Sequence, residues 1–130
     1  MRLDAGDADN GATSLIRVVG NPLESSSWRE TVLYQEGVPN TALPVDIDGD
    51  GDMDVIAAKR VRQQIVMIEN QGEGVRGELR MQAKPVQITP GFDAPLGWRG
   101  LSNAFHADTA DINNDGRLDL IVNVLELADD

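Results

Sequence analysis

The sequence has 130 residues, which is long enough for one ordinary domain. Its 22 acidic and 11 basic residues give a net charge of −11, which argues against nucleic acid as a partner. It has no cysteine and no apolar run of about 18 residues, so disulfides, thiolate metal sites and a membrane-spanning helix are not expected.

The first part of the chain is predicted to contain two short strands after a polar beginning. Residues 1–13 are rich in Gly and Asp, and we expect them to form a mobile N-terminus. Residues 15–19 and 28–34 are rich in aliphatic, aromatic and β-branched side chains, which is typical of strands. Gly20 and Pro22 end the first of these strands. No segment of the chain has a convincing helical period.

An acidic loop follows at residues 46–55. Its five aspartates occupy every second position, at Asp46, Asp48, Asp50, Asp52 and Asp54. Two carboxylates ~4 Å apart repel by roughly 4 kcal/mol at an effective dielectric constant of about 20, so such a loop either opens into water or folds around a cation. Oxygen ligands on a flexible loop suit a hard cation with six to eight ligands, which favours calcium over magnesium or zinc.

The loop recurs at residues 111–120 with the same spacing. A polar surface turn is the alternative for one such loop, because Asp, Asn and Gly dominate turns. Two copies, each followed by an apolar run, favour a cation site instead. An EF-hand does not fit, because that loop needs a glutamate at its twelfth position. This chain has Ala57 and Val122 there.

The runs around the first acidic loop have the pattern of strands. Residues 54–58 and 65–68 are apolar on both faces, so both faces of these strands are expected to be covered. Residues 41–45 lead into the loop. Pro44 cannot donate to a strand ladder, so this strand is expected either to lack a hydrogen bond at that position or to lie at a sheet edge. A turn is expected at residues 70–72.

The remaining chain is predicted to add three strands. One lies within residues 78–89. A Gly/Pro-rich excursion at residues 90–103 follows it. Residues 104–110 then lead into the second acidic loop, and residues 118–124 leave it.

A weak internal repeat gives the organisation of the chain. Residues 16–21 match residues 65–70 at an offset of 49, and one unit has the make-up of a four-stranded antiparallel sheet, the size of a β-propeller blade. We therefore predict an all-β partial propeller of about two to three blades. In chain order it comprises the mobile N-terminus (1–13), the second half of a blade (14–40), a complete blade with a calcium loop (41–89), the excursion (90–103) and the first half of a further blade with a calcium loop (104–130).

The two loops and their aliphatic exits resemble the FG-GAP and VCBS-type repeats of integrin α-chain propellers and of many bacterial extracellular proteins. In that family, the loop between the first two strands of a blade binds calcium. Matched position by position, the resemblance implies side-chain ligands at Asp46, Asp48, Asp50 and Asp54, and at Asp111, Asn113, Asp115 and Asp119. It also implies backbone carbonyl ligands at Asp52 and Arg117.

The resemblance implies a calcium-stabilised scaffold for binding or adhesion that is secreted or on the cell surface. An extracellular protein or a carbohydrate and the remaining blades of a larger propeller are its expected partners. The alternative is a propeller fragment of a secreted polysaccharide-active enzyme. No catalysis is expected, because the aspartates are accounted for as ligands and the only histidine, His106, lies in a lead-in strand. Phe92 and Trp98 are expected either to form a sugar-stacking platform or to pack in the core or between blades.

Overall fold

Antiparallel strands make up most of the structure. The computed structural model describes residues 11–35, 39–59, 64–86 and 104–124. The strands are β1 (Ala12–Val18), β2 (Trp28–Gln35), β3 (Pro39–Val45), β4 (Asp54–Lys59), β5 (Gln64–Glu73), β6 (Leu79–Val86), β7 (Ala104–Ala110) and β8 (Asp119–Val124). A single 3-10 turn, η1 (Ser25–Ser27), precedes β2. Within the described ranges, no helix has the length and apolar character needed to cross a membrane.

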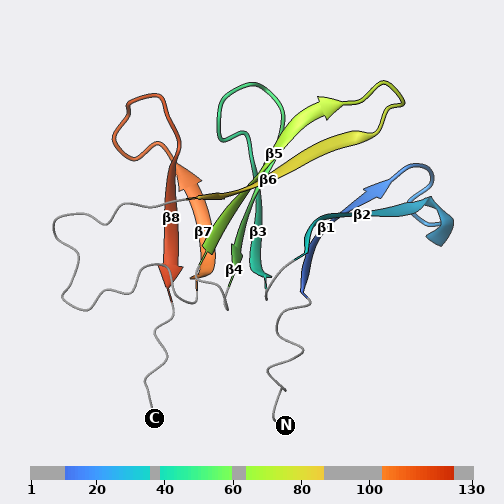
Figure 1. Ribbon diagram of the computed structural model, residues 1–130, viewed down its shortest axis with the longest axis horizontal. Helices are drawn as coiled ribbons and strands as arrows, with labels where there is room; N and C mark the ends of the chain where they lie inside the picture. The colour runs from blue at the N-terminus through green and yellow to red at the C-terminus, as the bar shows by residue number, and fades with distance from the viewer. Residues whose placement is uncertain (1–10, 36–38, 60–63, 87–103, 125–130) are drawn as a thin grey trace, which may run out of the picture.

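The strands form three sheets that follow the chain order. β3, β4, β5 and β6 make one four-stranded meander, while β1 pairs with β2 and β7 pairs with β8. Figure 1 shows the four-stranded sheet in the middle, with the β7–β8 pair on one side of it and the β1–β2 pair on the other. This arrangement confirms the predicted all-β fold of antiparallel, propeller-type blades.

The two middle strands of the central sheet carry the core. Ile56 and Ala57 are neighbours on β4, and because side chains alternate along a strand they point to opposite faces of the sheet. On the face of Ile56, the core comprises Val45, Ile56 and Ile65, with Leu120 and Val122 of β8 packed against them. On the face of Ala57, it comprises Ala57, Val66 and Ile68, with Leu33 and Tyr34 of β2 packed against them. Both faces are covered, as the apolar runs predicted.

Proline marks the edges of the central sheet. Among the described strands, β3 and β6 each have a single hydrogen-bonded neighbour. Pro44 lies in β3 and Pro85 lies in β6, where a missing N–H donor leaves no gap in an inner ladder. The predicted edge position of the strand that carries Pro44 is therefore confirmed.

Strand β5 is longer than the sequence indicated. The turn expected at residues 70–72 is wrong, because β5 continues to Glu73 across an irregularity in its pairing with β6. Gly72 has a φ of 78°, a conformation that lets a strand accommodate a bulge. The chain reverses further on, where the N–H of Gly74 donates to the carbonyl of Glu78 at 2.7 Å.

The first strand starts earlier than the strand expected at residues 15–19, because β1 begins at Ala12 and Thr13 is only 6% exposed. Leu33 and Tyr34 of β2 pack against the central sheet. Ile16, which the repeat aligns with the buried Ile65, is 51% exposed. The stretch 90–103, with Phe92 and Trp98, lies outside the described residues.

The outward face of the β1–β2 pair is exposed and carries four apolar side chains next to Ser14 and Glu30. Val18 pairs with Trp28, and Ser14 pairs with Val32, so these side chains and Ile16 share one face of the two-stranded sheet. Ile16, Val18, Trp28 and Val32 are between 44% and 52% exposed. Leu33 follows Val32 and points to the opposite face, toward the central sheet.

The core assignment predicts unequal effects for two isoleucines. Ile68→Ala removes a side chain with no exposed surface and should lower the free energy of unfolding by about 2–5 kcal/mol. Ile16→Ala, at an exposed position, is the control and should cost about 0.5 kcal/mol or less. Urea unfolding of both variants measures the difference in free energy of unfolding, and equal m-values would show that the two curves can be compared directly. Equal losses would contradict a core between β1–β2 and the central sheet.

Candidate metal centre

The two acidic loops occupy the same place in their sheets. Loop 1 (residues 46–53) joins β3 to β4, and loop 2 (residues 111–118) joins β7 to β8. Each is closed by a strand pair at its base, Val45 with Asp54 and Ala110 with Asp119. Figure 1 shows both loops at the same end of the molecule, and β7 lies against β3 and β4.

The first aspartate of loop 1 organises its backbone. One carboxylate oxygen of Asp46 accepts the N–H groups of Gly49 at 2.8 Å and Asp50 at 3.1 Å, and the other accepts the N–H of Gly51 at 3.0 Å. Gly49 and Gly51 have φ values of 76° and 96°, which favour glycine over residues with a Cβ. The sequence thus folds loop 1 into a tight coil around the Asp46 carboxylate.

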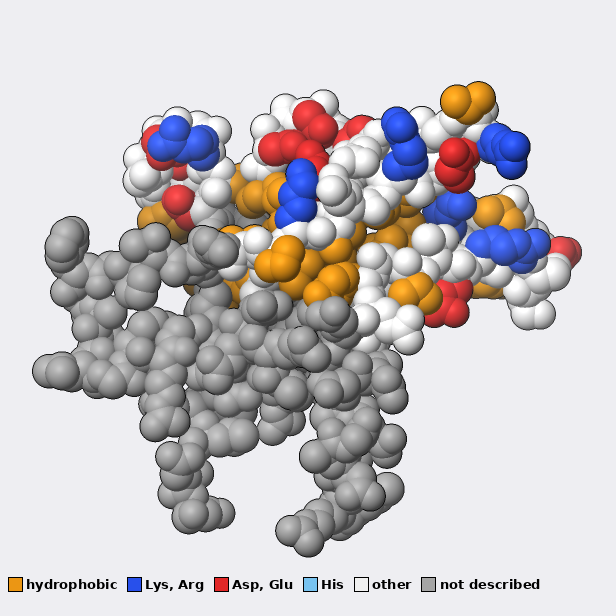
Figure 2. Space-filling model, in the orientation of Figure 1, with side chains coloured by type: hydrophobic (Ala, Val, Ile, Leu, Met, Phe, Trp, Pro, Cys, Tyr) orange, Lys and Arg blue, Asp and Glu red, His pale blue; other side chains and the backbone are white. Residues whose placement is uncertain are grey.

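Three of the predicted ligands are brought together by this coil. Asp46, Asp48 and Asp50 each offer a carboxylate oxygen, and these oxygens lie within 4.8 Å of one another. Asp46 is half-buried, and the other two are exposed. Figure 2 shows acidic side chains gathered on the loop at the top centre of the molecule, above the apolar side chains of the sheets.

The electrostatic balance of loop 1 favours a cation. The N–H of Asp50 donates to Asp48 and lowers its pKa, but partial desolvation and the charges of Asp50, Asp54 and Asp46 act in the other direction. The net result is a pKa of Asp48 above its ordinary value. The folded loop therefore holds its negative charges at some cost, and a bound cation would relieve that cost.

Asp54 and Asp52 lie outside the group of three. The side chain of Asp54 is completely buried, and its two oxygens accept the N–H of Ile47 at 3.2 Å and the N–H of Asn70 at 2.8 Å. Asp52 is exposed, and its N–H donates to Asp50 at 2.8 Å. Asp54 thus fastens both ends of loop 1 to β5.

Loop 2 repeats the backbone arrangement of loop 1 with different residues. Asp111 accepts the N–H groups of Asp115 at 3.1 Å and Gly116 at 2.8 Å. Asn114, with a φ of 58°, replaces Gly49, and asparagine tolerates this left-handed conformation. Asp119 accepts the N–H of Ile112 at 2.8 Å, as Asp54 does from Ile47.

The charges of loop 2 are compensated within the loop. The N–H of Arg117 donates to Asp115 at 2.9 Å, the Asn113 amide donates at 3.1 Å, and the Arg117 guanidinium forms an ion pair with the same carboxylate at 2.7 Å. These donors hold the pKa of Asp115 below its ordinary value, despite partial desolvation. Asp115 and Asp48 are therefore shifted in opposite directions.

Sequence reasoning missed Asn70 as a residue of this site. Asn70 falls in the turn expected at residues 70–72, although it lies on β5 and its side chain contacts loop 1. The available signal was its position at the end of an apolar strand in two aligned units, with Asn21 in the other unit.

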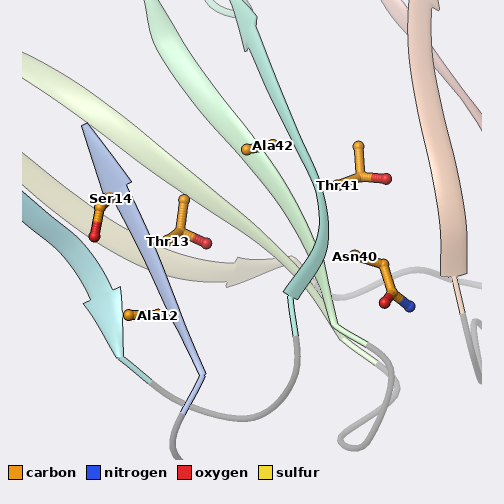
Figure 3. A pocket seen from close by; sticks show the side chains of 6 residues that line it. All are labelled: Ala12, Thr13, Ser14, Asn40, Thr41 and Ala42. Atoms are coloured by element: carbon orange, nitrogen blue, oxygen red, sulfur yellow. The ribbon is translucent and has the colours of Figure 1, made fainter. Parts of the chain in front are cut away.

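A separate pocket of about 240 Å³ lies between β1 and β3. Figure 3 shows Thr13 and Ser14 on one strand, and Asn40 and Thr41 on the other; Ala12 and Ala42 complete the lining. None of the six lining side chains is an acid or a base of the kind that general acid–base catalysis uses. His106 lies on β7 and is exposed.

The fold and the two loops define a class, an all-β protein of propeller-type blades with aspartate-rich loops between the first two strands of a sheet. A family model described as FG-GAP-like repeat matches residues 46–122, which is more than half of the chain, so the chain belongs to the FG-GAP-like repeat family. The matched range begins at the first aspartate of loop 1 and includes all of loop 2. No curated protein and no solved structure matches the chain.

The opposite pKa shifts predict opposite effects of two neutral substitutions in calcium-free buffer. The raised pKa of Asp48 means that its contribution to stability is present at low pH and lost as pH rises through that pKa. The lowered pKa of Asp115 means that its contribution is present above its ordinary pKa and lost as pH falls through the lowered one. At neutral pH, Asp48→Asn should therefore raise the midpoint of thermal unfolding, and Asp115→Asn should lower it.

Thermal melts in chelator at neutral pH measure both midpoints. Asp108→Asn, at an exposed position on β7, is the control and should leave the midpoint unchanged. Shifts of the same sign for Asp48→Asn and Asp115→Asn would contradict the electrostatic difference between the loops.

Proposed function

We propose that this chain is a calcium-binding segment of FG-GAP-type repeats in which an ion in each loop makes the blade rigid. The observation that carries the proposal is the convergence of Asp46, Asp48 and Asp50, whose oxygens lie within 4.8 Å of one another. Membership of the FG-GAP-like repeat family supports the propeller-like segment to which these loops belong.

The number of available oxygen ligands favours calcium over magnesium. Calcium accepts six to eight oxygens in a flexible geometry, whereas magnesium demands a near-ideal octahedron and keeps several of its waters. Loop 1 offers the three converging carboxylates of Asp46, Asp48 and Asp50, and the chain supplies further oxygens at Asp52 and Asp54.

The remaining ligands follow from the order of residues in each loop. In loop 1, the backbone carbonyl of Asp52 and the carboxylate of Asp54 complete the set. In loop 2, the corresponding side chains are those of Asp111, Asn113, Asp115 and Asp119, with the carbonyl of Arg117. Asp54 accepts one N–H on each oxygen, and because a carboxylate oxygen has two lone pairs, each retains capacity for an ion.

We propose an extracellular binding or adhesion role, without catalysis, for the scaffold that the ions stabilise. Calcium sites of extracellular modules have Kd values of ~10⁻⁴ to 10⁻³ M, so sites of this strength fill where free calcium is high, outside cells. A protein or carbohydrate ligand is the partner proposed for a secreted or cell-surface scaffold. The exposed apolar face of Ile16, Val18, Trp28 and Val32 is suited to contact with a further blade.

Calcium should stabilise the chain. It relieves the repulsion in loop 1 and binds only the folded form, so a site with Kd ~10⁻⁴ M should add about 2.7 kcal/mol at a hundredfold excess of calcium over Kd. Thermal melts with calcium, with magnesium and with chelator measure the effect. We expect a higher midpoint with calcium than with the other two. Equal midpoints with calcium and with chelator would refute the proposal.

The two sites should differ in affinity. Loop 1 offers the carboxylates of Asp46, Asp48 and Asp50, whereas loop 2 has the neutral Asn113 at the second of these positions. In addition, the ion pair between Arg117 and Asp115 competes with a metal ion for that carboxylate. Affinity in such loops follows ligand charge and rigidity, so loop 1 should bind more tightly.

Calorimetry on two variants tests this order. Asp50→Ala leaves loop 2 as the intact site, and Asp115→Ala leaves loop 1. The order is wrong if the site that remains in Asp50→Ala is the tighter one.

A further inference from the structure

We infer that Asn70 on β5 is a positioning residue for loop 1, and that it sets the calcium affinity of this loop without contacting the ion. The inference rests on the proposed function of loop 1. Asn70 is 16 residues from Asp54 in the chain, and it lies on a different strand from either end of loop 1. Its contacts join the exit of loop 1 to the bulge in β5.

Asn70 makes three hydrogen bonds at this junction. Its backbone N–H donates to Oδ1 of Asp54 at 2.8 Å, and its side-chain Nδ2 donates to the carbonyl of Met53 at 3.2 Å. Its side-chain Oδ1 accepts the N–H of Gly72 at 2.9 Å. The amide therefore uses both its donor and its acceptor, one toward loop 1 and the other toward the bulge.

The exit of loop 1 depends on these bonds because apolar packing does not hold it. Met53 is 56% exposed, so its side chain does not anchor the chain between Asp52 and Asp54. Asp54 is completely buried and needs hydrogen-bond donors, since an unpaired buried carboxylate is costly. Asn70 and Ile47 supply one backbone N–H each.

The bulge in β5 lies next to loop 1. Gly72 has a φ of 78°, and a Cβ built at this position would lie 4.0 Å from a carboxylate oxygen of Asp52. Loop 1 and the bulge are therefore close to one another both at Asn70, which bonds to Met53, and at Gly72, which lies near Asp52.

A comparison within the chain supports a specific role for Asn70. Asn21, which the repeat aligns with Asn70, accepts the N–H of Leu23 at 3.1 Å and so serves a local turn.

The test measures calcium affinity at one loop at a time. On an Asp115→Ala background, calorimetry reports loop 1, and Asn70→Ala should weaken its affinity by about 10- to 100-fold, the usual effect of removing a partner that orients a metal ligand. On an Asp50→Ala background, which reports loop 2, the same substitution should change affinity by less than about twofold. Asn21→Ala is the matched control and should leave loop 1 affinity unchanged. A general loss of packing would not separate the two loops in this way.

A second substitution covers the case in which Asn70→Ala does not fold. Asn70→Ser keeps an oxygen for the N–H of Gly72 and removes the donor to Met53, so it should weaken loop 1 in the same direction. The inference is overturned if the Asp115→Ala protein binds calcium and neither substitution changes its affinity by more than about twofold. If the unsubstituted chain binds no calcium at all, the proposed function itself fails, and the inference fails with it.

Discussion

The buried carboxylate of Asp54 is the constraint on which the central sheet and loop 1 both depend. A carboxylate without exposed surface must be hydrogen-bonded, and here the donors are two backbone N–H groups from Ile47 and Asn70. One belongs to the entrance of the loop and the other to the third strand of the blade. Satisfying this one side chain therefore fixes the loop, β4 and β5 relative to one another. The geometry of the proposed calcium site therefore depends on the sheet, because the buried Asp54 side chain connects the loop to β5.

The two loops show that one backbone design can carry two different charge distributions. Both coil around their first aspartate, and both close at a strand pair. Loop 1 leaves its acids in mutual repulsion, which a bound cation of the kind proposed would relieve. Loop 2 uses Asn113 and Arg117 to neutralise Asp115 from within. This internal compensation lowers the electrostatic repulsion in loop 2. It also lowers the stabilisation that a bound cation would add, because less repulsion is left to relieve.

Local chemistry in the sequence was enough to predict much of this structure. The apolar runs of β4 and β5 indicated strands covered on both faces, and Pro44 indicated an edge, because each signal depends on neighbours in the chain. The spacing of the aspartates located both loops. The bulge after Asn70 was missed, because Asn-Gln-Gly is also a common turn pattern and only the bond to Asp54 distinguishes the two. The sequence also did not indicate that β2, through Leu33 and Tyr34, packs against the central sheet, because that contact joins residues far apart in the chain.

The left-handed backbone shared by Gly49 and Asn114 has a consequence for how an ion would bind to these loops. A left-handed backbone residue stands at this position in both loops, and the Asp46 and Asp111 carboxylates already hold the N–H groups around it. The coil is thus defined by backbone conformation and internal hydrogen bonds. An ion of the kind proposed would have little chain to order, so the entropic cost of its binding would be small. Association would then be governed by loss of water from the ion and by attraction to the negative loops, rather than by a rearrangement of the protein.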